Sequence, residues 1–255
     1  MKKMKNSLNT NIKRARGFTL VELLVTITII IVLASLSTLA VAKMREKALT
    51  VTATKRISGL VIANTMYATE NNGKYVASYS FDDESKPGTP WHYNPEFLLP
   101  LIGEELDIED AVEFEGVDKL PEVVLDPIVV RAKKKYWSRI SASFAYNNEN
   151  VPGGDWGNPG TSRGHTVASV KNPSEQFAFI TATDWIANYG GRFRWASSPV
   201  EGKSEDSKIA YRHQNKAIVA YYDGHCDTKT IKEIKALDKL GGINNVFWGG
   251  TKRAR

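Results

Sequence analysis

An almost uninterrupted apolar run occupies residues 18–42, and its only ionisable side chain is Glu22. As a helix the run would be roughly 37 Å long, since each residue adds about 1.5 Å, and the hydrocarbon core of a bilayer is about 30 Å thick. The run therefore predicts one transmembrane helix over residues 18–42. A carboxylate inside such a helix is costly, so Glu22 is expected to have a function and a partner.

The charge of the chain is concentrated before this run. The first 17 residues contain no acid and carry six basic side chains: Lys2, Lys3, Lys5, Lys13, Arg14 and Arg16. The formal net charge of the whole chain is also +6, so the rest of the chain is close to neutral and a nucleic-acid partner is not expected. Basic residues before a transmembrane helix favour a cytoplasmic N-terminus, with everything after residue 42 on the other side of the membrane.

A cleaved secretory signal is the competing interpretation, because a charged leader followed by an apolar run is its usual pattern. The apolar run is longer than the hydrophobic region of a typical signal peptide. It also continues into an amphipathic helical pattern without a clean small-residue cleavage site. An anchor that stays attached is therefore favoured.

The residues around the start of the run resemble a known processing site. The string Arg16-Gly17-Phe18-Thr19-Leu20-Val21-Glu22 is similar to the cleavage site of type IV prepilins, which is found in pilins and in the pseudopilins of type II secretion. The basic leader and the apolar helix that follows complete the resemblance.

The resemblance implies a role for individual residues. A prepilin peptidase would cut between Gly17 and Phe18 and usually methylate the new N-terminus at Phe18. Glu22, then the fifth residue, would neutralise the N-terminal amine of a neighbouring subunit while the helices pack into a filament core. A buried carboxylate paired with an ammonium favours one packing register, whereas an unpaired one is strongly unfavourable.

The helix is expected to continue over residues 43–72. This stretch has no proline, and apolar or small residues recur on one face at spacings of three and four: Ile57, Leu60, Val61, Asn64 and Ala68. Four further residues are expected to broaden this apolar surface: Val51, Ile62, Met66 and Tyr67. Asn72-Gly73 supplies a C-terminal stop. The predicted fold is α+β and pilin-like, with a long helix packed on an antiparallel sheet formed by an extracytoplasmic domain over residues 73–255.

Local patterns place several elements in this domain. Residues 119–130 are interpreted as a strand interrupted by Pro127, and residues 91–102 as a short helix. The segment QFAFITATDW is a candidate for a buried strand. Residues 216–222 and 225–229 are predicted to form a hairpin around Asp223-Gly224, and Thr230 and Glu233 have the spacing of a capping box before a short helix.

A second resemblance concerns the end of the domain. His213 is followed by nine residues and then by Asp223-Gly224, which is similar to the H-X9-DG element of domains associated with prepilin processing. The phrases FAYN and KNPSEQFAFITATD also resemble that family. Members often carry Cys-Pro where this chain has Asp126-Pro127, so Cys226, the one cysteine, lacks the thiol with which it would otherwise form a bond.

Other kinds of site are less favoured. His213, His225, Asp223 and Asp227 are residue types that bind divalent metals, but their spacing fits no zinc or calcium pattern, so no metal or other cofactor is expected. The alternative is that Asp223-Gly224 makes a turn and His213 bonds to nearby backbone. No motif of an enzyme stands out, and an enzyme is not expected.

Two functional hypotheses remain. The first is a structural subunit of a type IV pilus or a type II secretion pseudopilus, with prepilin peptidase, other pilin or pseudopilin subunits and the inner membrane as partners. The second is a membrane-anchored module that binds a ligand, such as a carbohydrate, outside the cytoplasm. Three tryptophans in polar segments are compatible with stacking against sugars, although for each of them a position covering the core is the favoured explanation: Trp156, Trp185 and Trp195.

Overall fold

The computed structural model describes residues 18–80, 89–103, 122–132, 143–151, 164–190, 209–239 and 241–250. The chain forms two compact units, residues 1–45 and residues 46–255. Its longest element, helix α1 (Leu20–Glu70), begins in the first unit and ends in the second. The predicted leader, residues 1–17, lies outside the described residues.

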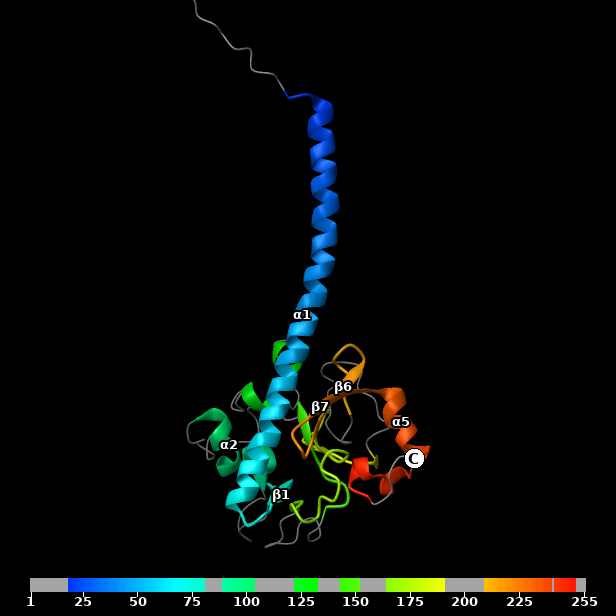
Figure 1. The fold of residues 1–255 in the computed structure, drawn as a ribbon. Helices are drawn as coiled ribbons and strands as arrows, with labels where there is room; N and C mark the ends of the chain where they lie inside the picture. The colour runs from blue at the N-terminus through cyan, green and yellow to red at the C-terminus, as the bar shows by residue number, and fades with distance from the viewer. Residues whose placement is uncertain are drawn as a thin grey trace, which may run out of the picture. The chain divides into compact units, whose positions relative to one another are not determined.

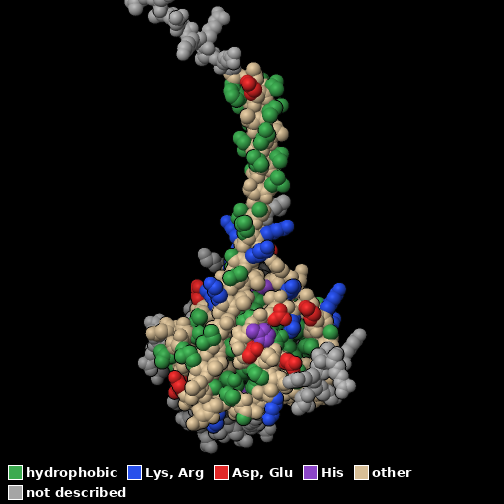
Figure 2. Space-filling view, viewed as in Figure 1, with side chains coloured by type: hydrophobic (Ala, Val, Ile, Leu, Met, Phe, Trp, Pro, Cys, Tyr) green, Lys and Arg blue, Asp and Glu red, His purple; other side chains and the backbone are tan. Residues whose placement is uncertain are grey.

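The first part of α1 buries nothing in the described structure. All described side chains of residues 18–45 are exposed, and apolar side chains cover every visible side of the segment (Figure 2). Among the described residues, α1 is the helix long and apolar enough to cross a membrane. Isolated exposed apolar residues are ordinary on soluble proteins, but a contiguous surface of this extent requires lipid or a protein partner to cover it.

The second unit is built on a mixed sheet, with β1 (Tyr79–Ser80) and β2 (Thr89–Pro90) forming a separate pair. In the described part of the chain, the main sheet has five strands in the order β5 (Ile186–Ala187), β3 (Phe144–Asn147), β4 (Phe177–Thr181), β6 (Lys216–Tyr221) and β7 (Cys226–Thr230). Neighbours are antiparallel except β3 and β5, which are parallel. The expected α+β fold with a long N-terminal helix and antiparallel strand pairing is therefore present (Figure 1).

Both faces of the main sheet are buried. One face shares a core with α1, and the other packs against α5 (Ile231–Lys239) and the short helical turn Val246–Trp248. Phe177 and Ile180 point to the second core while Phe179 points to the first. The strict alternation of a strand is broken here because the pairing of β4 with β6 shifts between Phe177 and Phe179.

The predicted inner face of α1 is confirmed, since Ile57, Leu60, Val61, Asn64 and Ala68 are all buried. Of the four further residues expected to broaden this surface, Tyr67 packs partly buried against the core, as expected. The expectation is wrong for Val51, Ile62 and Met66, which are about half exposed and lie on the side of the helix that turns away from the sheet. The helix ends at Glu70, followed by Asn72 and Gly73 in the left-handed conformation, as the stop signal predicted.

Capping side chains begin the shorter helices. Asn94 accepts a hydrogen bond from the Phe97 amide at the start of α2 (Pro95–Ile102), just after the 3₁₀ turn Trp91–Tyr93. Thr230 and Glu233 form the predicted capping box of α5, with three mutual hydrogen bonds. The 3₁₀ turn Gly242–Asn244 follows α5.

The prediction of a strand over residues 119–130 is wrong. The described part of this region forms a 3₁₀ turn, Glu122–Val124, and then helix α4 (Pro127–Ala132). The β-branched residues of this stretch favour a strand, but Asp126 and Pro127 occupy the N-cap and first helical positions, where these two residue types start helices. The helix-start signal of Asp126 and Pro127 therefore outweighs the strand preference of the β-branched residues.

Candidate functional site

The predicted processing site lies at the start of α1. Gly17 lies outside the described residues, and Phe18, on the other side of the expected cut, is 71% exposed. Phe18 and Thr19 precede the first residue of the helix, Leu20. Exposed residues outside regular structure are the preferred sites of proteolytic cleavage.

Glu22 has a local partner that the sequence interpretation did not consider. Its carboxylate accepts hydrogen bonds from the backbone amide and the hydroxyl of Thr19, both at 2.8 Å, and the Thr19 hydroxyl accepts one from the Glu22 amide at 3.2 Å. This is a capping box, with Thr19 at the N-cap and Glu22 three residues later. The signal Thr-x-x-Glu was present in the sequence, in the same form as Thr230 and Glu233.

The box places the Glu22 carboxylate beside the residue that would follow the new N-terminus. Thr19, which binds it, is adjacent to Phe18 in the chain. A helix N-terminus also carries a partial positive charge, which favours an acid at this position. Glu22 thus has two compatible uses: it starts the helix, and it presents a negative charge at the end where a free amine would be created.

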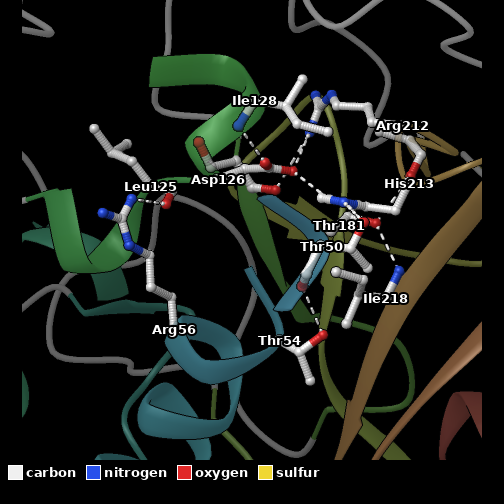
Figure 3. Close-up of polar contacts among 12 residues, drawn as sticks. Thr50, Thr54, Arg56, Leu125, Asp126, Ile128, Thr181, Arg212, His213 and Ile218 are labelled. Carbon is white, nitrogen blue, oxygen red and sulfur yellow. Dashed lines mark hydrogen bonds and ion pairs between the residues drawn. The ribbon is translucent and has the colours of Figure 1, made fainter. Parts of the chain in front are cut away.

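A second group of polar residues is buried in the globular unit. The side chain of His213, just before β6, bonds to residues from two other elements: its Nε2 lies 3.0 Å from Oδ2 of Asp126, and its Nδ1 lies 3.2 Å from the hydroxyl of Thr50 on α1. The side chains of His213 and Asp126 are fully buried. Figure 3 shows the three converging from α1, the start of α4 and the segment before β6.

Asp126 performs two tasks with its two oxygens. Oδ1 accepts a hydrogen bond of 2.8 Å from the Ile128 amide and so caps α4. Oδ2 faces His213 and, at 3.6 Å, the guanidinium of Arg212. The guanidinium is anchored in turn by the Ala182 carbonyl at 2.7 Å.

The pKa of Asp126 depends on its burial and on its two neighbours, His213 and Arg212. Burial alone would raise this pKa, but the hydrogen bond from His213 and the positive charge of Arg212 outweigh burial, and the pKa of the carboxyl is lowered. Asp126 is therefore ionised at neutral pH and compensates Arg212. Its negative charge favours a proton on Nε2 of His213. The Thr50 hydroxyl, 3.2 Å from Nδ1 of His213, donates a hydrogen bond of 3.0 Å to the Glu46 carbonyl.

The turn after His213 has an uncommon backbone. The amide and carbonyl of His213 exchange hydrogen bonds of 3.1 Å with those of Lys216, so Gln214 and Asn215 form a two-residue turn. Both have positive φ, at 55° and 62°. Asn tolerates this conformation, but Gln does so at a cost of roughly 1 kcal/mol or more.

The two halves of the H-X9-DG element lie at opposite ends of one strand. His213 precedes β6, whereas Asp223 and Gly224 follow it and form the turn to β7, with Gly224 at φ 94° donating to the Tyr221 carbonyl. The predicted hairpin is present, although four residues rather than two separate its strands. Asp223 contacts His225 next to it, and His213 contacts Asp126.

Among the described residues, no three His, Cys, Asp or Glu side chains are grouped so as to hold an ion. Cys226 is a free, partly buried thiol. Trp185 packs partly buried against the core that α1 shares with the sheet, while Trp156 and Trp195 lie outside the described residues.

Sequence reasoning missed the partners of His213. The interpretation that His213 bonds to nearby backbone holds for its amide and carbonyl, but its side chain reaches residues 87 and 163 positions away. Asp126 was noted only as a departure from a Cys-Pro pattern. The Asp-Pro helix start could have located Asp126 at a helix N-terminus, whereas no sequence signal pointed to Thr50.

The comparisons with known proteins concern the first of these two sites. The family model described as the prokaryotic N-terminal methylation motif matches residues 12–38. The match contains the predicted cleavage position, Glu22 and most of the apolar run, so the chain is prepilin-like in this segment. No curated protein and no solved structure matches the chain.

Proposed function

We propose that this chain is a structural subunit that prepilin peptidase cleaves between Gly17 and Phe18, and that it assembles through α1 into a type IV pilus or a type II secretion pseudopilus. The observation that carries the proposal is the match of the methylation motif to residues 12–38, directly over the start of α1. Other pilin or pseudopilin subunits and the inner membrane would be its partners.

The physical argument for assembly rests on what α1 leaves uncovered. The described large apolar side chains of its first part are exposed, and none of them belongs to either core of the globular unit. Lipid would cover them in the membrane, and parallel copies of the same helix would cover them in a filament. The N-terminus would remain cytoplasmic and the globular unit extracytoplasmic before assembly.

The charge of Glu22 determines how far one helix is shifted along its neighbour in the assembly. Its carboxylate sits in a capping box at the helix start, with the residue before Thr19 providing the amine after cleavage. When one helix shifts along another, the amine of one copy can meet the carboxylate of its neighbour. Burial between helices strengthens this pairing and makes an unpaired Glu22 unfavourable.

Processing is tested by intact-mass analysis of the full chain expressed with and without a prepilin peptidase. The expected result is a peptidase-dependent loss of residues 1–17 together with a methyl group on Phe18. Gly17→Leu should remain unprocessed in the same cells while still reaching the membrane. An unprocessed wild-type N-terminus, or cleavage after residue 42, would overturn the proposal.

A further inference from the structure

A pocket of about 450 Å³ opens beside the buried His213 group, a volume within the usual range for small-molecule sites. All residues that line it belong to the globular unit, and they combine charged, amide, hydroxyl and apolar side chains. They are Glu46, Leu49, Thr50, Ile128, Arg131, Tyr211, Arg212, His213, Gln214 and Asn215.

Two polar side chains of the pocket, those of Arg212 and His213, already have partners within the protein. Arg212 is 2% exposed at its side chain, lies next to Asp126 and donates to the Ala182 carbonyl, so its charge is committed within the protein. His213 is held by Asp126 and Thr50. These residues form a rigid polar wall rather than free ligand-binding groups.

Two opposite charges remain on the lining. Glu46 on α1 and Arg131 on α4 are on the same pocket, yet within the described parts of the chain neither side chain forms an ion pair. An acid and a base that face one pocket without pairing can each bind one end of a ligand that carries both charges. A purely anionic ligand would be repelled by Glu46, and a purely cationic one by Arg131.

The turn at Gln214 and Asn215 adds two side-chain amides to this lining. Both residues hold a left-handed backbone that glycine adopts more easily. Amides donate and accept hydrogen bonds without adding net charge, which suits a ligand whose own net charge is zero. Leu49 and Ile128 supply apolar contact for a short side chain or methylene group.

From this arrangement we infer that the pocket binds a small zwitterion, with Arg131 facing its anionic group and Glu46 its ammonium. A free α-amino acid and the phosphoethanolamine headgroup of a lipid share this chemistry. The inference concerns the globular unit alone, so it does not depend on processing or assembly of α1.

The test is calorimetric titration of the detergent-solubilised full chain with L-leucine and, separately, with glycerophosphoethanolamine. Saturable binding of either compound supports the inference, and the compound that binds more tightly identifies the source of the ligand.

N-acetyl-L-leucine lacks the ammonium and L-leucinamide lacks the carboxylate. Each should bind the wild-type protein about 10- to 100-fold more weakly than L-leucine, the usual effect of losing one charge-assisted hydrogen bond. If glycerophosphoethanolamine is preferred, glycerophosphate and ethanolamine take the place of these two analogues.

Substitutions assign each charge to its residue. The Glu46→Gln protein should bind L-leucine more weakly than the wild type does, and it should bind L-leucine and N-acetyl-L-leucine equally. The Arg131→Gln protein should bind L-leucine and L-leucinamide equally. Glu70→Gln and Lys171→Gln remove exposed charges away from the pocket and should leave binding unchanged. If the ligand is a lipid headgroup, the Glu46→Gln protein should bind glycerophosphoethanolamine and glycerophosphate equally, and the Arg131→Gln protein should bind glycerophosphoethanolamine and ethanolamine equally.

The Gln214→Gly variant separates an effect on ligand affinity from an effect on the stability of the fold. Glycine relaxes the turn, so the melting temperature should rise, whereas loss of the amide should lower the affinity for the zwitterion. The inference is overturned if neither L-leucine nor glycerophosphoethanolamine binds saturably, if a singly charged analogue binds better than its zwitterion, or if Glu46→Gln and Arg131→Gln leave binding unchanged.

Discussion

At the scale of single residues, the two acids at helix starts share a design. Glu22 and Asp126 each cap a helix, and each holds its charge where a second partner can use it. For Asp126 that partner is present, because His213 and Arg212 lie against its second oxygen. For Glu22 the proposed partner is the amine of another copy. Capping alone requires only a hydrogen-bond acceptor, so neutral variants separate the two tasks.

Glu22→Gln should therefore keep the capping box, since glutamine also accepts at this position. It should be processed and inserted normally but fail to assemble, because the amine of the neighbouring subunit would lose its counter-charge. The measurement is the yield of sheared filaments or of crosslinked oligomers in membranes. Thr19→Ala is the matched control: it removes the cap and keeps the acid, and should reduce yield only modestly. Normal assembly of Glu22→Gln would contradict the assigned role.

Asp126→Asn applies the same logic to the buried group. Asparagine caps helices as well as aspartate does, so α4 should persist, but Arg212 would lose its counter-charge in a buried site. We expect a loss of about 3 kcal/mol in the free energy of unfolding, measured by denaturant titration with tryptophan fluorescence. Asp126→Ala should lose about 1 kcal/mol more, because the cap is also removed.

The pH dependence of the Asp126 contribution has a defined sign. The pKa of Asp126 is lower in the folded protein than its ordinary value near 3.8. Its ionised form therefore stabilises the fold above that ordinary value, and the contribution disappears as the pH falls through the lowered pKa. The difference between wild type and Asp126→Asn should shrink below about pH 4 and be constant from pH 5 to 7. A difference that grows on acidification would contradict this account.

At the scale of elements, the features that were predicted correctly are those determined by residues close together in the sequence. The inner face of α1 and the capping box of α5 depend on spacings of three and four, and both were predicted from sequence. The structure of α4 was mispredicted because β-branched residues were weighted above the Asp126-Pro127 start signal. The contact of His213 with Asp126 and Thr50 joins three distant segments, and no local pattern in one sequence encodes such a contact.

The two sides of α1 provide a test at this scale. Leu60 is fully buried against the sheet, so Leu60→Ala should cost about 2–5 kcal/mol in the free energy of unfolding of the globular unit. Ile62 is 57% exposed, and Ile62→Ala should change it by less than about 0.5 kcal/mol. Thermal unfolding followed by tryptophan fluorescence in detergent would compare them. Equal losses would mean that the outer side of α1 is covered within one chain.

At the scale of the whole molecule, the globular unit buries two histidines that the cluster at Asp126 does not include. His92 and His165 are 3% and 2% exposed, and each has one ring nitrogen without a hydrogen-bond partner among the described residues. Burial lowers the pKa of His92 to about 3 and that of His165 to about 4. Both are therefore neutral in the folded protein at any pH at which the protein would be handled.

The unfolded chain binds protons at these histidines near pH 6.5, whereas the folded chain does not. The stability they confer is complete above pH 6.5 and is lost as the pH falls, because protons then favour the unfolded state. Between pH 7.5 and 5.5 each histidine should lower the free energy of unfolding by about 1 kcal/mol. This window lies well above the pKa of Asp126, so the titration of that carboxyl does not contribute to the change.

Replacing the two rings by phenylalanine isolates the effect. His92→Phe and His165→Phe should each remove about 1 kcal/mol of the loss between pH 7.5 and 5.5, and the double variant should remove about twice as much. Denaturant titrations at the two pH values measure it directly. Each variant also removes an unpartnered buried nitrogen, so none should be less stable than the wild type at pH 5.5. A double variant that retains the full loss would show that the two rings take up protons without unfolding, and hence that water reaches them in the folded state.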